Sequence, residues 1–82
     1  MIYPPNVEML DLIKSRPHYE VSFGTEAEAR EEEYLLNDGW SPFIDTEVDG
    51  TTLYFSNVPI FEDHARIVAE NWWDGRAKLV NP

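Results

Sequence analysis

The dipeptide Asp49-Gly50 lies between two segments in which apolar and polar residues alternate, and this feature most constrains the fold of the 82-residue chain. Asp-Gly favours a two-residue type I′ turn, in which both central residues have positive φ. Such a turn pairs the residues of the two segments on one face: Val48 with Thr51, Thr46 with Leu53, and Ile44 with Phe55. Side chains alternate along a strand. The sequence therefore predicts a hairpin over residues 40–56 with one buried face.

Two elements are predicted on the N-terminal side of the chain. A helix over 6–15 begins after the capping residue Asn6 and ends before Pro17, which excludes the preceding residue from helical geometry. Residues 18–23 alternate strictly, and the apolar face consists of Tyr19, Val21 and Phe23. This alternation predicts a half-buried strand.

A second helix is predicted from the capping box formed by Thr25 and Glu28 to about residue 37. Gly39 is expected to end it as a left-handed C′ residue. At about 100° per residue, one helix face carries Ala27, Glu31, Tyr34 and Leu35. We expect this narrow apolar stripe, with Glu31 beside it, to lie on the sheet.

A last helix is predicted over 60–73. Its apolar residues recur at helical spacing: Phe61, Ala65, Val68 and Trp72. The segment 76–82 is predicted to be a flexible end or a frayed edge strand through Leu79 and Val80, and residues 1–5 are a second flexible end. The order is then α-β-α-β-β-α. This order predicts an α+β fold, a single small domain over 1–82, with a three-stranded, mainly antiparallel sheet packed by helices.

The charge balance excludes several classes of function. Six Lys and Arg against sixteen Asp and Glu give a formal charge of −10, which repels nucleic acid phosphates and anionic lipids.

No apolar run reaches the about 18 residues of a membrane span, and the N-terminus lacks the pattern of a signal peptide. The absence of Cys fits a reducing cytoplasm. We therefore expect a cytoplasmic protein without direct nucleic acid or membrane binding.

Acidic residues gather in two places, on the second helix and along one strand of the hairpin. The candidate partner-binding carboxylates are Glu26, Glu28, Glu31, Glu32, Glu33, Asp45, Glu47 and Asp49. Like charges at helical spacing weaken a helix by a few tenths of a kcal/mol per pair. Such repulsion serves either solubility or a basic partner, and both interpretations remain open.

Other motifs give weaker signals for chemistry. The segment 45–50 begins like a calcium loop, but its twelfth position is Ser56 where a bidentate Glu is required. His18 and His64 have no nucleophile or metal-ligand set at a suitable spacing, so both are interpreted as surface or half-buried side chains. We predict no catalytic residue, no metal and no cofactor.

The dipeptide Trp72-Trp73 is a candidate apolar contact. Adjacent helical residues point about 100° apart, so one indole can enter the core while the other lies near the rim. Tryptophan is enriched at binding hot spots. We therefore add Trp73 to the candidate partner-binding residues, with a wholly structural role for both indoles as the alternative.

The middle of the chain resembles a group of small bacterial and phage domains of unknown function. The resemblance covers about residues 19–55 and rests on a strand, a helix ending Leu35-Leu36-Asn37-Asp38-Gly39-Trp40-Ser41-Pro42, and a hairpin. It implies this order of elements and carries over no catalytic residue. By class alone, size and acidity are similar to those of phage inhibitors such as anti-CRISPR proteins and DNA mimics.

These observations support three hypotheses. The first is a non-enzymatic, phage-related binding protein that blocks a basic nucleic-acid-binding surface of a host protein in the host cytoplasm. The second is a small structural or homo-oligomerising domain, which allows a homodimer. The third is a small-molecule binder or enzyme subunit. The sequence names neither the partner nor the oligomeric state.

Overall fold

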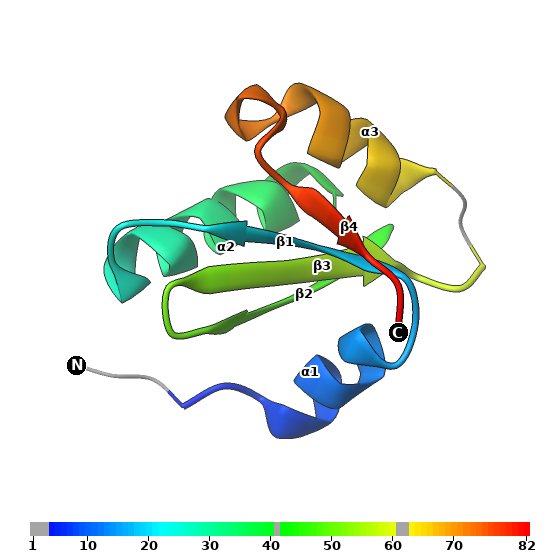
Figure 1. The fold of residues 1–82 in the computed structure, drawn as a ribbon, viewed down its shortest axis with the longest axis horizontal. Coiled ribbons are helices and arrows are strands. Elements are labelled where there is room, and N and C mark those ends of the chain that lie inside the picture. Colours follow the sequence, from blue (N-terminus) through cyan, green and yellow to red (C-terminus); the bar gives the residue numbers. More distant parts are fainter. Residues whose placement is uncertain (1–3, 41, 61–62) are drawn as a thin grey trace.

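Four antiparallel strands form one sheet in the order β2-β3-β1-β4 in the computed structural model, which describes residues 4–40, 42–60 and 63–82. The strands are β1 (His18–Ser22), β2 (Ile44–Asp49), β3 (Thr52–Asn57) and β4 (Lys78–Val80). The helices are α1 (Val7–Lys14), α2 (Glu26–Trp40), α3 (His64–Asn71) and the short 3-10 helix η1 (Trp73–Gly75). The α+β class is confirmed. Figure 1 shows α1 on one side of the sheet and α2 and α3 on the other.

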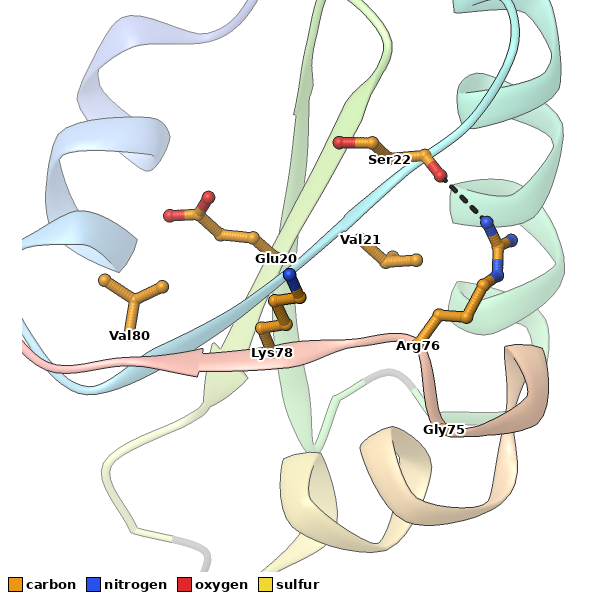
Figure 2. A pocket seen from close by; sticks show the side chains of 7 residues that line it. All are labelled: Glu20, Val21, Ser22, Gly75, Arg76, Lys78 and Val80. Carbon is orange, nitrogen blue, oxygen red and sulfur yellow. Dashed lines mark hydrogen bonds between the residues drawn. The ribbon is translucent and has the colours of Figure 1, made fainter.

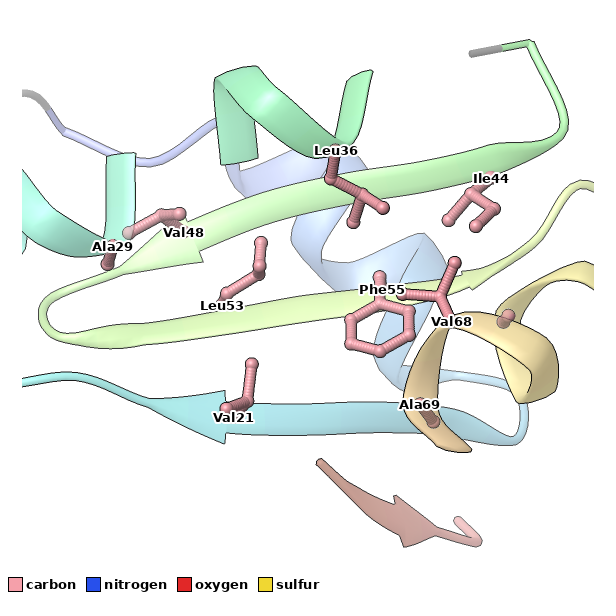
Figure 3. Close-up of a cluster of buried hydrophobic side chains, with 10 residues drawn as sticks. Val21, Ala29, Leu36, Ile44, Val48, Leu53, Phe55, Val68 and Ala69 are labelled. Atoms are coloured by element: carbon pink, nitrogen blue, oxygen red, sulfur yellow. The ribbon is translucent and has the colours of Figure 1, made fainter. Parts of the chain in front are cut away.

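The main core lies between the sheet and the pair α2 and α3 (Figure 3). The strands contribute Val21, Ile44, Val48, Leu53 and Phe55, and the helices contribute Ala29, Leu36, Ala65, Val68 and Ala69. The alternation in β1, β2 and β3 therefore points the predicted apolar face toward these helices. On the opposite face, α1 buries Leu10 and Ile13.

The sheet has a fourth strand that the predicted three-stranded sheet lacks. β4 pairs with β1, with His18 opposite Val80 and Glu20 opposite Lys78. The segment 76–82, predicted as a flexible end or a frayed edge strand, thus contains β4. Three residues are too few to show an alternation of their own, so backbone pairing with β1 is what makes this segment a strand.

The predicted register of the hairpin is wrong by two residues. Val48 pairs with Leu53 and Asp49 with Thr52, so Gly50 and Thr51 are the central residues of the turn. Gly50 has a φ of 62°, and a positive φ at the first central residue is the pattern of a type II′ turn. A shift of two residues leaves every side chain on its predicted face. Ile44, Thr46 and Phe55 therefore keep the orientation that the sequence indicates.

The helix boundaries are confirmed for α1 and corrected elsewhere. The Asn6 side chain accepts a hydrogen bond from the Met9 N–H, as expected of a cap. α2 continues through Gly39 to Trp40, so Gly39 is not a left-handed C′ residue. α3 begins at His64, after Asp63 with a φ of 64°, and covers less than the predicted 60–73. Phe61, which the prediction placed on the helix face, lies outside the described residues.

The face of α2 that meets the sheet is also not the predicted one. Ala29 and Leu36 are fully buried, whereas Tyr34 and Leu35 are 72% and 48% exposed. Ala29 and Leu36 are seven residues apart, about two helical turns, and they pack on β2 and β3 as Figure 3 shows. The predicted stripe therefore faces away from the sheet.

Candidate functional site

Arg30 of α2 crosses to the edge strand β2 and pairs with two candidate carboxylates. Its Nη1 lies 3.0 Å from Glu47 Oε1 and 3.5 Å from Glu33 Oε1. Its Nη2 donates a hydrogen bond of 3.3 Å to the Val48 carbonyl. Glu47, expected on an exposed strand face, is therefore buried beside a cation. We call this group, Arg30, Glu33 and Glu47, the α2–β2 seam.

Glu33 is held in the seam by a second hydrogen bond. The Thr46 hydroxyl donates to Glu33 Oε2 at 3.1 Å. Burial raises the pKa of Glu33, and the nearby Glu47 carboxylate raises it further, against the lowering effects of the Thr46 and Arg30 contacts. This carboxylate therefore serves the packing of α2 on β2.

Asp45 is engaged on the opposite side of the sheet, beneath α1. Its carboxylate accepts from the Arg16 guanidinium, whose Nε donates to the buried Ser56 hydroxyl at 2.9 Å. The side chains of Arg16 and Asp45 are 19% and 22% exposed. Asp45 is thus neutralised within the fold and lies on a different surface from α2.

Both histidines are packing residues. His18 is 3% exposed, and its Nδ1 and Nε2 lie 2.8 Å from the Arg16 carbonyl and 3.2 Å from Glu20 Oε2. The predicted surface or half-buried position of His18 is therefore wrong, because α1 covers this end of the sheet. His64 stacks on Phe43 with ring centroids 4.7 Å apart.

Trp73 is tied to α2 and the core. Its Nε1 donates to Glu32 Oε2 at 3.2 Å, and its ring lies 5.9 Å from the Phe23 ring and 5.8 Å from the Phe55 ring. Trp72 and Trp73 are both half-buried, but neither belongs to α3, because the backbone turns extended at Trp72. The structure thus assigns the Trp73 indole N–H and Glu32 to an internal contact.

Some acidic side chains of α2 are exposed and take no part in these internal contacts. Glu28 and Glu31 are exposed, as is Asp38 in the last turn, and no ion pair within the described part of the chain involves them. Glu26 is half-buried at the start of the helix, and Asp49 is exposed at the hairpin turn. The structure therefore divides the predicted site. One group of carboxylates is internal, and a smaller group remains on the outside of α2.

A pocket of about 580 Å³ lies elsewhere, over β1 and β4 (Figure 2). It is lined by Glu20, Val21, Ser22, Gly75, Arg76, Lys78 and Val80, none of which was a candidate. Arg76 donates to the Ser22 carbonyl at 3.3 Å and lies 5.5 Å from the centre of the Phe23 ring. Sequence reasoning missed this pocket because β4 was not part of the predicted sheet.

Within residues 4–40, 42–60 and 63–82, no group of three or more His, Asp or Glu side chains could hold a metal ion. No described helix has the length and apolar character of a membrane span.

Comparisons with protein-family models, curated proteins and solved structures find no match. Function is therefore inferred from the residues of this chain alone.

Proposed function

We propose that this protein is a non-enzymatic, phage-related binding protein whose acidic helix α2 occupies a basic, nucleic-acid-binding surface of a host protein. Anti-CRISPR proteins and DNA mimics are the class of inhibitor that this describes. One observation carries the proposal. The exposed carboxylates Glu28, Glu31 and Asp38 have no cationic partner among residues 4–40, 42–60 and 63–82.

The distribution of cations supports this interpretation. Three arginines pair with carboxylates elsewhere: Arg16 with one of β2, Arg30 with those of the seam, and Arg66 with one of α3 and one just before it. None of these pairs involves the outer side of α2. The last turn of α2 contains no basic residue, although the helix dipole favours a cation there and disfavours Asp38. A basic partner would relieve this unfavourable arrangement.

The proposed complex should depend strongly on salt concentration, because it is held by charge. A surface of one sign speeds encounter with a surface of the opposite sign. Salt screens such attraction, because the Debye length falls from about 10 Å at 0.1 M to about 3 Å at 1 M. Binding should therefore be strong at low salt and weak at high salt, and nucleic acid should compete for the same surface.

The test compares two variants that remove the same number of charges. The first combines Glu28→Gln, Glu31→Gln and Asp38→Asn. The control combines Glu8→Gln, Asp11→Asn and Asp74→Asn, which are exposed residues outside α2. Each variant and the unmodified protein are used to capture host proteins at low and high salt, with DNA as competitor.

We expect the unmodified protein and the control to retain a salt-sensitive partner that DNA displaces, and the first variant to lose it. Equal loss in both variants would mean that net charge alone matters. A complex that holds this protein and nucleic acid together in the same groove would also refute the proposal.

A further inference from the structure

We infer that the outer face of α2 docks as a helix into a groove with an apolar floor and basic rims. This inference rests on the proposed function and specifies the surface that the partner presents. The docking face consists of Glu31, Tyr34, Leu35 and Asp38, all of them exposed. We call these four residues the α2 docking stripe.

The spacing of the stripe is that of a helix that binds in a groove. Its residues fall at i, i+3, i+4 and i+7, the positions through which an amphipathic helix contacts a partner. Tyr34 and Leu35 occupy the middle, and the carboxylates of Glu31 and Asp38 lie one turn away on either side. The apolar pair is thus framed by acid at both ends of the stripe.

The fold leaves much of this apolar surface exposed. α2 is fixed to the sheet through the buried side chains of Ala29 and Leu36 and through the Arg30 contacts with β2. Tyr34, at 72% exposed, retains most of its side chain for another contact. Aromatic side chains inside a ring of polar residues are the usual anchors of protein interfaces.

Charge complementarity determines the occupant. A second copy of this chain, docked stripe against stripe in a two-fold dimer, would oppose the carboxylates of Glu31 and Asp38 with those of the other copy. Like charges placed opposite each other across an interface disfavour that dimer. A partner with Lys or Arg beside an apolar cleft matches both parts of the stripe.

Two synthetic helical peptides test the inference. They have equal length and equal Lys and Arg content, and one carries a leucine stripe where the other carries glutamine, which has similar helix propensity. Affinity is measured by NMR titration of the unmodified protein, of Tyr34→Ala/Leu35→Ala and of Leu12→Ala. Leu12 of α1 is a matched control, because it is 48% exposed, as is Leu35.

We expect the leucine peptide to bind the unmodified protein and the Leu12→Ala control about tenfold more tightly than the glutamine peptide, which corresponds to about 1.4 kcal/mol. Tyr34→Ala/Leu35→Ala should remove this difference. The Tyr34 ring signals of the unmodified protein should shift with the leucine peptide, a readout that does not depend on the folding of any variant.

The outcomes separate the two proposals. Equal affinity for both peptides, lost in the Glu28, Glu31 and Asp38 variant, would overturn the apolar anchor and leave the acidic surface in place. Failure of the unmodified protein to bind either peptide would overturn the inference, and the capture of host proteins would then decide the proposed function by itself. An equal loss of affinity in Leu12→Ala would place the contact outside the α2 docking stripe and overturn the inference.

Discussion

Arg30 is the cation on which two carboxylates of the α2–β2 seam depend, and we expect Arg30→Met to destabilise the fold strongly. Methionine keeps the aliphatic stem and a comparable helix propensity. It removes the guanidinium between the side chains of Glu47 and Glu33, which are 12% and 16% exposed. Two largely desolvated carboxylates would then lie close together without their cation.

The magnitude follows from the contacts. The 3.0 Å contact with Glu47 is a charged hydrogen bond, a type worth about 1.5–3 kcal/mol. The 3.5 Å contact with Glu33 is closer to a surface pair, which contributes at most about 1 kcal/mol. We therefore expect a loss of about 3 kcal/mol, which lowers Tm by about 12–24 °C in a domain of this size.

Urea denaturation measured across pH distinguishes this mechanism from a loss of packing. Without Arg30 the pKa of Glu33 should rise further, so the folded state would hold its proton more tightly than the unfolded state. The loss in free energy of unfolding that Arg30→Met causes should then become smaller as the pH falls. When the protein already carries Glu47→Gln, adding Arg30→Met should lower the free energy of unfolding by less than it does in the parent. A loss below about 0.5 kcal/mol, the range of ordinary surface substitutions, or a deficit independent of pH, would refute this reasoning.

Three further predictions concern the hairpin, the seam and metal binding. Gly50→Val should cost at least about 1 kcal/mol, since Gly50 has a φ of 62°; an unchanged melting curve would contradict the turn. The pKa of Glu33 is raised above its ordinary 4.5, so its favourable contribution is present at low pH and is lost as pH rises through the raised value. The free energy of unfolding of the parent, relative to that of Glu33→Gln, should therefore fall as the pH rises. A difference that does not change with pH would contradict this. Millimolar calcium should leave Tm nearly unchanged. A protein that bound calcium, at a concentration about a hundredfold above Kd, would gain about 2.7 kcal/mol in free energy of unfolding, and the rise in Tm would contradict this prediction.

Local signals in the sequence predict local structure correctly and choose less well between competing faces. The cap at Asn6 and the strict alternation around Val21 each have one interpretation, and both are confirmed. Asp49-Gly50 predicts a turn with Gly50 as its second central residue, whereas the structure makes Gly50 the first. The outcome depends on pairing Val48 with Leu53 across the hairpin, which the preference of one dipeptide does not determine.

The candidate site shows the same limit. The carboxylates of α2 are visible in the sequence, but which of them are internal depends on where α2 crosses β2. Glu33 and Glu47 meet Arg30 only because Ala29 and Leu36, rather than Tyr34 and Leu35, face the sheet. Ala29 and Leu36, two turns apart with a small residue as one of the pair, give a weaker periodic signal than the adjacent Tyr34 and Leu35. The sequence pattern therefore predicts Tyr34 and Leu35 to face the sheet, and this prediction is wrong.

The position of β1 within the sheet affects synthesis as well as folding. β1 pairs with β3 and β4, which are both synthesised later. Ser22 can pair only after Thr52, thirty residues further along the chain, has been synthesised, and His18 only after Val80. At the about 5–20 residues per second of translation, β1 leaves the ribosome about 2–6 s before its first partner strand. The next segment to emerge is the first half of α2, with five glutamates over residues 26–33. Like charges on neighbouring nascent chains repel each other, and this repulsion opposes association through the apolar side of β1 before β3 has emerged.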